Sequence, residues 1–113
     1  MPEKISIVNT VTFAASASGY LSVYRPTAGR KAVVKKFKAC FPPGSENYLH
    51  VAIYHGIRQA IPRSGAISGD GVCIEVEAEE EYLSEEEVKL WYNNTDTVNS
   101  RTVTYILEIE LTK

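Results

Sequence analysis

The chain has 113 residues, of which 44% are hydrophobic and 23% charged, and its formal net charge is −2. This length fits a single domain over residues 1–113 whose core needs neither a disulfide nor a metal ion. The balanced charge gives no reason to expect nucleic acid or a membrane surface as a partner, and no run approaches the roughly 20 apolar residues of a membrane span.

The first half of the chain alternates apolar and polar residues, which is typical of strands with one buried face. This pattern predicts strands over residues 5–15, 20–25, 33–41, 48–55 and 57–61. Pro26, Pro42 and Pro62 follow the second, third and fifth of these segments, where a residue without a backbone N–H ends strand pairing. Gly56 supplies a tight turn between the last two, which are therefore expected to form a hairpin.

The second half begins with a loop over residues 63–71, which contains three glycines and two serines and shows no periodicity. The alternation then resumes and predicts strands over residues 72–79, 88–93 and 101–111. The Glu-rich segment 79–87 is interpreted as a charged connection, although Ser84 and Glu87 could cap one helical turn there. Because no segment is long enough for a crossover helix, the pattern indicates about eight antiparallel strands.

The third and sixth predicted strands carry matching side chains at alternate positions. An antiparallel register that joins two cysteines also brings lysines opposite glutamates. The pairs in this register are Cys40 with Cys73, Lys38 with Glu75, and Lys36 with Glu77. The cysteines are expected to be close neighbours, and the sequence leaves open whether they are bonded. Strict alternation would turn Val33 and Lys35 to the core, and a lysine there indicates a bulge or a short strand.

Two packed sheets allow eight antiparallel strands to bury one face each. A jelly roll would place the basic third strand between the acidic sixth and eighth strands, as cross-strand charge pairing favours. One sheet would then have the order first, eighth, third, sixth, and the other the order second, seventh, fourth, fifth. We therefore expect an all-β antiparallel sandwich with jelly-roll topology, with an immunoglobulin-like sandwich or a small barrel as the alternative.

The second of these sheets is predicted to expose an aromatic surface. Its outward positions hold Tyr20, Tyr24, Tyr48, His50, Tyr54, Lys89 and Trp91. Tyrosine and tryptophan suit interfaces because each combines a large rigid apolar body with a polar tip. The competing interpretations are that tyrosines are simply good strand formers or that a loop covers them. Arg58 lies near the hairpin between the fourth and fifth strands, with Arg63, and could bind a ligand or another subunit.

No pattern of residues points to catalysis, a metal or a cofactor. His50 and His55 lie five positions apart on one strand and so face opposite sides, which does not suit shared metal ligation. A serine in the 63–71 loop (Ser64 or Ser68), His55 and Asp70 could be imagined as a triad, but no nucleophile-elbow spacing supports one. We therefore predict no catalytic residues, no metal ligands and no cofactor, and interpret Asp70 as a turn residue.

The strand pattern over the whole chain resembles the single jelly rolls of virus and phage structural proteins, and also jelly-roll carbohydrate-binding modules. The viral resemblance implies a non-enzymatic capsid, decoration or appendage protein that self-associates through the aromatic surface. The alternative is a carbohydrate- or ligand-binding module. Because no basic start precedes an apolar run, we expect synthesis in the cytoplasm without a signal peptide, and incorporation into a particle. One Gln, one Met and many Glu, Lys and Tyr residues favour a thermophilic source.

Overall fold

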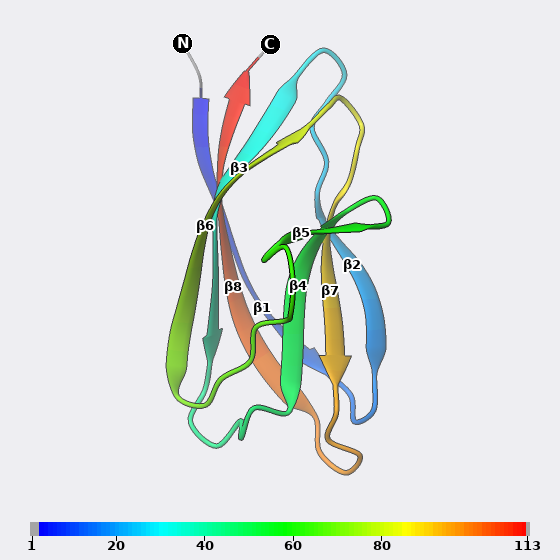
Figure 1. Ribbon diagram of the computed structural model, residues 1–113, viewed down its shortest axis with the longest axis vertical. Helices are drawn as coiled ribbons and strands as arrows, with labels where there is room; N and C mark the ends of the chain where they lie inside the picture. The colour runs from blue at the N-terminus through cyan, green and yellow to red at the C-terminus, as the bar shows by residue number, and fades with distance from the viewer. Residues whose placement is uncertain (1–2, 113) are drawn as a thin grey trace.

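The computed structural model describes residues 3–112, which form strands and connecting turns without any helix, and hence without one that could cross a membrane. The strands are β1 (Glu3–Phe13), β2 (Ser18–Tyr24), β3 (Lys31–Phe41), β4 (Leu49–His55), β5 (Arg58–Ile61), β6 (Val72–Tyr82), β7 (Val88–Asn94) and β8 (Arg101–Thr112). Figure 1 shows most of them running along the long axis of the molecule, with the short β5 lying across it and the first and last strands side by side.

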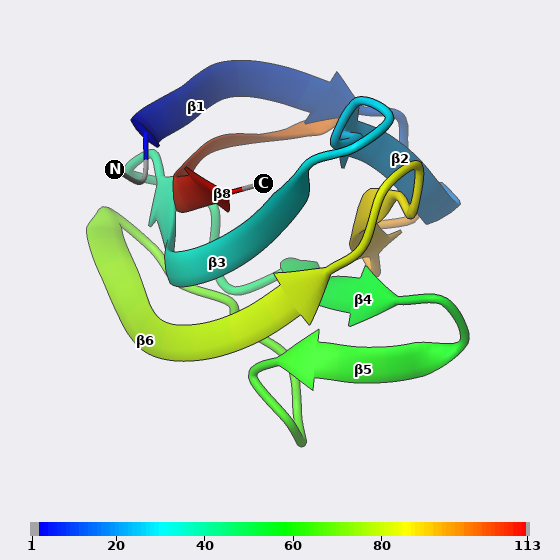
Figure 2. The ribbon, with the colours of Figure 1, turned by 90° about the horizontal axis from the view of Figure 1, so that it is seen from above.

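The strands form two four-stranded sheets with the orders β1-β8-β3-β6 and β2-β7-β4-β5. All neighbouring strands are antiparallel. This is the jelly-roll topology that the charge pattern predicts, and the immunoglobulin-like alternative is wrong. Seen from above, the two sheets face each other as curved layers, with β5 and β6 along one lateral side (Figure 2).

The core fills the space between the sheets. Its largest inaccessible side chains include Phe37 and Leu107 from one sheet and Leu49, Ile53 and Leu90 from the other. They lie at alternate positions of their strands, because the period of two turns every second side chain to one face. Each such side chain stabilises the fold by about 1.5–3 kcal/mol relative to its exposed state.

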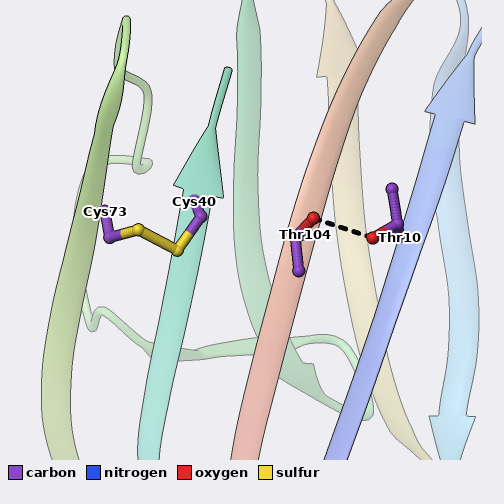
Figure 3. The surroundings of a disulfide bond; sticks show 4 residues. All are labelled: Thr10, Cys40, Cys73 and Thr104. Carbon is purple, nitrogen blue, oxygen red and sulfur yellow. Dashed lines mark hydrogen bonds between the residues drawn. A yellow bond between two sulfur atoms is a disulfide. The ribbon is translucent and has the colours of Figure 1, made fainter.

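Strands β3 and β6 pair in the register that the alternation predicts. Cys40 lies opposite Cys73, Lys38 opposite Glu75, and Lys36 opposite Glu77. The two cysteines form a disulfide on the outer face of the sheet, with their Cα atoms 3.9 Å apart (Figure 3). The question that the sequence left open is therefore answered in favour of a bond.

A bulge at Lys35 explains the residue that broke the alternation. The register of β3 shifts between Val34 and Lys36 against both neighbouring strands. The extra residue lets Lys35 and Lys36 both stay at the surface and reverses the alternation before it, so that Ala32 and Val34 are buried. The prediction that Val33 faces the core is therefore wrong, and this side chain is only half-buried.

The lysines of β3 reach glutamates on both neighbouring strands, but not always the ones directly opposite. Lys36 Nζ lies 3.3 Å from a carboxylate oxygen of Glu108 and 3.6 Å from one of Glu75. Lys35 Nζ lies 2.9 Å from Glu79, whose hydrogen bond raises the lysine pKa. Lys38 forms no ion pair with any described residue. Diagonal pairing of long side chains therefore replaces the two direct pairs expected from the register.

Strand β6 continues to Tyr82, three residues beyond the predicted end at Glu79. The connection after it is a turn in which Glu86 N donates to Leu83 O, so the prediction that the whole segment 79–87 is a connection is wrong. Ser84 caps no helix, because its hydroxyl instead donates to Arg30 O at 2.9 Å.

Candidate assembly interface

Three aromatic rings from three strands meet on the outer face of the β2-β7-β4-β5 sheet. Tyr20 and Tyr54 are in edge-to-face contact with ring centroids 5.3 Å apart, and Tyr54 lies 6.4 Å from Trp91. Register places Tyr20 directly opposite Trp91 across β2 and β7. His50 shares this side through β4, where it lies opposite Asn93. We call Tyr20, His50, Tyr54 and Trp91 the aromatic face.

The aromatic face belongs to a sheet whose strands contain no carboxylate. The segments SGYLSVY, LHVAIYH, RQAI and VKLWYNN lack Asp and Glu, whereas β6 alone carries five glutamates. Lys89 lies beside the face, with its Nζ 6.0 Å from the centroid of the Tyr20 ring. Tyr20 is 54% exposed, a large apolar surface for a strand residue. A partner that covers this sheet would therefore not have to remove water from any carboxylate on the four strands of the sheet.

Two residues predicted for this surface lie elsewhere, and Arg58, predicted as a ligand or subunit contact near the hairpin, is bound within the chain. Tyr24 packs against the core, because a bulge between Ser22 and Tyr24 sets it opposite the buried Val88. Tyr48 precedes β4 and lies against the Arg101 guanidinium, 4.9 Å from its ring centroid. Arg58 turns away towards the other sheet, where it binds a buried glutamate.

That glutamate, Glu80, fixes the β4–β5 hairpin to the opposite sheet. It is 7% exposed and accepts hydrogen bonds from the Arg58 guanidinium and from His55 Nδ1, the latter at 2.7 Å. Burial raises the pKa of Glu80, but the bonds from His55 and Arg58 outweigh it, so the pKa lies below its ordinary value. The imidazole of His55 stacks on Tyr82 with centroids 4.1 Å apart, and its Nε2 lies 3.1 Å from Glu86. We call Glu80, His55, Arg58 and Glu86 the hairpin anchor.

The hairpin anchor was missed because Glu80 lies within a run of glutamates that reads as a solvated segment. The sequence does carry a signal for it, because the alternation of β6 continues past Glu79. Every second residue from Val72 faces the core side, and this series includes Glu80 and Tyr82. Tyr82 is fully buried, and its hydroxyl donates to Tyr54 O at 2.9 Å. Desolvation raises the pKa of this phenol.

A second polar network closes the opposite end of the sandwich, in the segment predicted only as a polar loop. Asp96 Oδ2 accepts from Arg101 Nε at 3.0 Å and Nη2 at 2.6 Å, while its Oδ1 accepts from the backbone N–H of Val98 at 2.9 Å. Arg101 Nη1 in turn donates to Gly44 O at 2.7 Å, which joins the β7–β8 and β3–β4 connections. The backbone bond from Val98, with further bonds from Asn99 and Arg101, lowers the pKa of Asp96 to about 2.

We expect this network to make stability depend on pH in acid. Because the pKa of Asp96 is lower in the folded chain than in the unfolded chain, its ionised carboxylate stabilises the fold. This contribution is complete above the ordinary pKa of 3.8 and is lost as the pH falls through about 2. D96N should therefore be less stable than the wild type at neutral pH, with a difference that shrinks below pH 3.8 and disappears only below about pH 2. Urea titrations at a series of pH values test this, with E46Q as the control, since Glu46 is exposed and its side chain bonds to no other described residue. A difference that does not change with pH would contradict the assignment.

The residues considered for chemistry do not form a site. His55 is committed to Glu80 and Glu86, and Asp70 accepts a hydrogen bond from Gly44 N at 2.7 Å, as a turn residue would. His50 and His55 lie on opposite sides of β4. Among residues 3–112, no group of three or more His, Cys, Asp or Glu side chains is placed to hold a metal ion.

No protein-family model matches the sequence, and no curated protein matches it either. Solved structures with a similar fold include a chain of the acid-stable capsid of Helicobacter pylori bacteriophage KHP30, at 13% identity and a TM-score of 0.56. That match covers 100% of this chain and 99% of the phage chain. The chain shares the jelly roll of viral capsid proteins.

Two further similar structures come from other viruses. A chain of Sulfolobus turreted icosahedral virus has a TM-score of 0.62 and 13% identity, and the match covers 96% of this chain but 29% of that one. A chain of the cyanophage Pam1 capsid has a TM-score of 0.50 and 10% identity, and the match covers 96% of this chain and 85% of the phage chain. At such identities the similarity establishes the fold alone.

Proposed function

We propose that this protein is a non-catalytic structural component of a virus particle and that copies of it associate through the aromatic face. The observation that carries the proposal is a partly exposed aromatic cluster on a sheet whose strands contain no carboxylate. The jelly roll shared with capsid chains supports the particle as the setting. The proposed occupant of the face is a second copy of this chain.

The chemistry of the face favours a copy of itself over a charged partner. Tyr20, Tyr54 and Trp91 are residue types enriched in the buried centres of interfaces. Two such faces brought together would oppose aromatic rings, histidines and amides, with Lys89 as the cation beside the rings. The strands bring no carboxylate into the contact, and the long side chain of Lys89 can keep its ammonium group in water at the rim, so the contact gains from apolar area.

The geometry favours protein over sugar as the partner. Sugar rings stack best on aromatic rings that present a flat platform, whereas the Tyr20 and Tyr54 rings stand at 76° to each other. The carbohydrate-binding alternative has its own test, because Trp91 is the only tryptophan and its fluorescence reports on this face. A change of Trp91 emission with a glycan, at protein concentrations where the chain stays monomeric, would favour the alternative.

Substitutions on the aromatic face test self-association. Y20S and W91S are each expected to weaken it by about 30-fold, because a central aromatic anchor is typically worth 2 kcal/mol or more. Sedimentation velocity over a concentration series measures the loss. V8S is the matched control, since Val8 is 60% exposed on the outer side of the other sheet. Equal association of Y20S, W91S and the wild type would contradict the proposal.

A further inference from the structure

The lateral side of the sandwich between β5 and β6 is incompletely closed. Strand β5 has 4 residues and faces the 11 residues of β6 across the gap between the sheets (Figure 2). Ile74, Val76 and Ala78 point inward from β6 but are only half-buried. A cleft of about 260 Å³ lies here, with Ala60, Pro62, Val76 and Ala78 among its apolar lining residues.

The β4–β5 hairpin presents an apolar side chain next to Arg58, whose partner Glu80 lines this cleft. Ile57 occupies the two-residue turn Gly56-Ile57 and is fully exposed, at a position where polar residues are usual. The turn is held rigid, because Glu80 binds His55 and Arg58 at its two ends. A fixed, fully exposed isoleucine has the properties of an anchor residue that enters a partner's cleft.

Charge is divided across the same side of the molecule. The hairpin and the loop after β5 carry Arg58 and Arg63, whereas β6 carries Glu77 and Glu79 on the other wall. Arg63 and Glu77 both line the cleft, and neither forms an ion pair with another described residue. Since Arg58 is bound to Glu80 and Glu79 to Lys35, the unpaired charges are Arg63 on one wall and Glu77 on the other, with apolar residues between them.

We infer that this lateral side is a two-fold contact with a second copy of the chain, distinct from the aromatic face. Under a two-fold axis, the wall that carries Arg63 in each copy faces the wall that carries Glu77 in the other, so Arg63 meets Glu77 twice. Ile57 of each copy enters the apolar cleft of the other and covers Val76 and Ala78. A surface of this kind is self-complementary, which is what selects another copy over an unrelated partner.

The lateral contact, together with the aromatic face, would allow assemblies larger than a dimer. A single two-fold contact closes on itself and yields only pairs, whereas two different contacts on one chain permit a larger assembly. The inference does not depend on the aromatic face, since it stands on residues of β5, β6 and their hairpin. The two contacts can therefore be tested separately.

Charge reversal in a Y20S background, where the aromatic contact is weakened, tests the lateral contact. R63E and E77R are each expected to weaken dimerisation by about tenfold or more, because like charges then face each other twice. An equimolar mixture of the two should dimerise as the Y20S parent does, since every like pair becomes an opposite pair. Sedimentation velocity measures both results. Single variants that dimerise like the parent, or a mixture that stays monomeric, would overturn the inference.

Replacement of the hairpin residue tests the apolar part of the contact. I57D in the Y20S background is expected to weaken dimerisation by about 30-fold. V98D is the control, since Val98 is 79% exposed at the opposite end of the molecule and should have no effect. Loss of association in Y20S alone supports only the aromatic face, whereas loss in I57D alone supports only the lateral contact. An I57D chain that dimerises as V98D does would contradict the insertion of Ile57.

Discussion

Removing the disulfide with the double substitution C40S and C73S is expected to destabilise the fold by about 3–4 kcal/mol. The bond joins residues 33 positions apart and encloses β4 and β5, so its loss frees a long loop in the unfolded chain. Chemical denaturation of the double variant and the wild type measures the difference. The double variant should still fold, because the core contacts of β3 and β6 remain.

A matched control lies on the same face of the same sheet. The hydroxyl groups of Thr10 and Thr104 are 2.8 Å apart across β1 and β8 without a covalent link (Figure 3). Replacing both by alanine is expected to cost less than about 1 kcal/mol, since an exposed cross-strand pair contributes little. If the disulfide variant loses no more than this control, then the bond does not restrict the unfolded chain as proposed.

Replacing the buried carboxylate of the hairpin anchor with E80Q is expected to cost about 3 kcal/mol. This value is at the lower end of the roughly 3–5 kcal/mol typical of a broken buried ion pair, because the Arg58 side chain is 54% exposed and water can hydrate it once Glu80 is replaced. The cost also depends on pH: the lowered pKa of Glu80 means that its contribution is complete above the ordinary value of 4.5 and is lost as pH falls through the folded value.

The neighbouring E81Q variant is the control for the anchor. Glu81 lies on the same strand but is exposed on the outer side, so its replacement should change stability by less than about 0.5 kcal/mol. Denaturant titrations at pH 7 and below pH 4.5 compare E80Q, E81Q and the wild type. Equal losses in E80Q and E81Q at pH 7 would show that the anchor does not hold the hairpin.

The strands and their order could be predicted because the information is local or pairwise. Period-2 alternation records which face of a strand is buried, and the lysines of β3 with the glutamates of β6 and β8 indicate which strands are neighbours. The errors begin where one extra residue enters a strand. The bulge at Lys35 reverses the side that Val33 faces, and the bulge near Tyr24 moves that ring from the surface to the core.

The candidate site was only half predictable for a related reason. Tyr20, His50, Tyr54 and Trp91 follow regular alternation and lie on the predicted side of the sheet. Arg58 and Tyr48 do not, because their positions depend on partners far away in the sequence, Glu80 and Arg101. Long-range polar contacts at strand ends leave no periodic signal in the chain.

The proposed role requires that copies of the chain associate, so the most direct measurement is the native mass of the unmodified protein over a rising concentration series. We predict species larger than a dimer, because the aromatic face and the lateral contact together join each copy to more than one neighbour. The emission of Trp91 should shift to the blue as these species form, since their growth covers its indole. A protein that keeps the mass of one copy and an unchanged Trp91 emission at the highest concentration reached would contradict the proposed assembly.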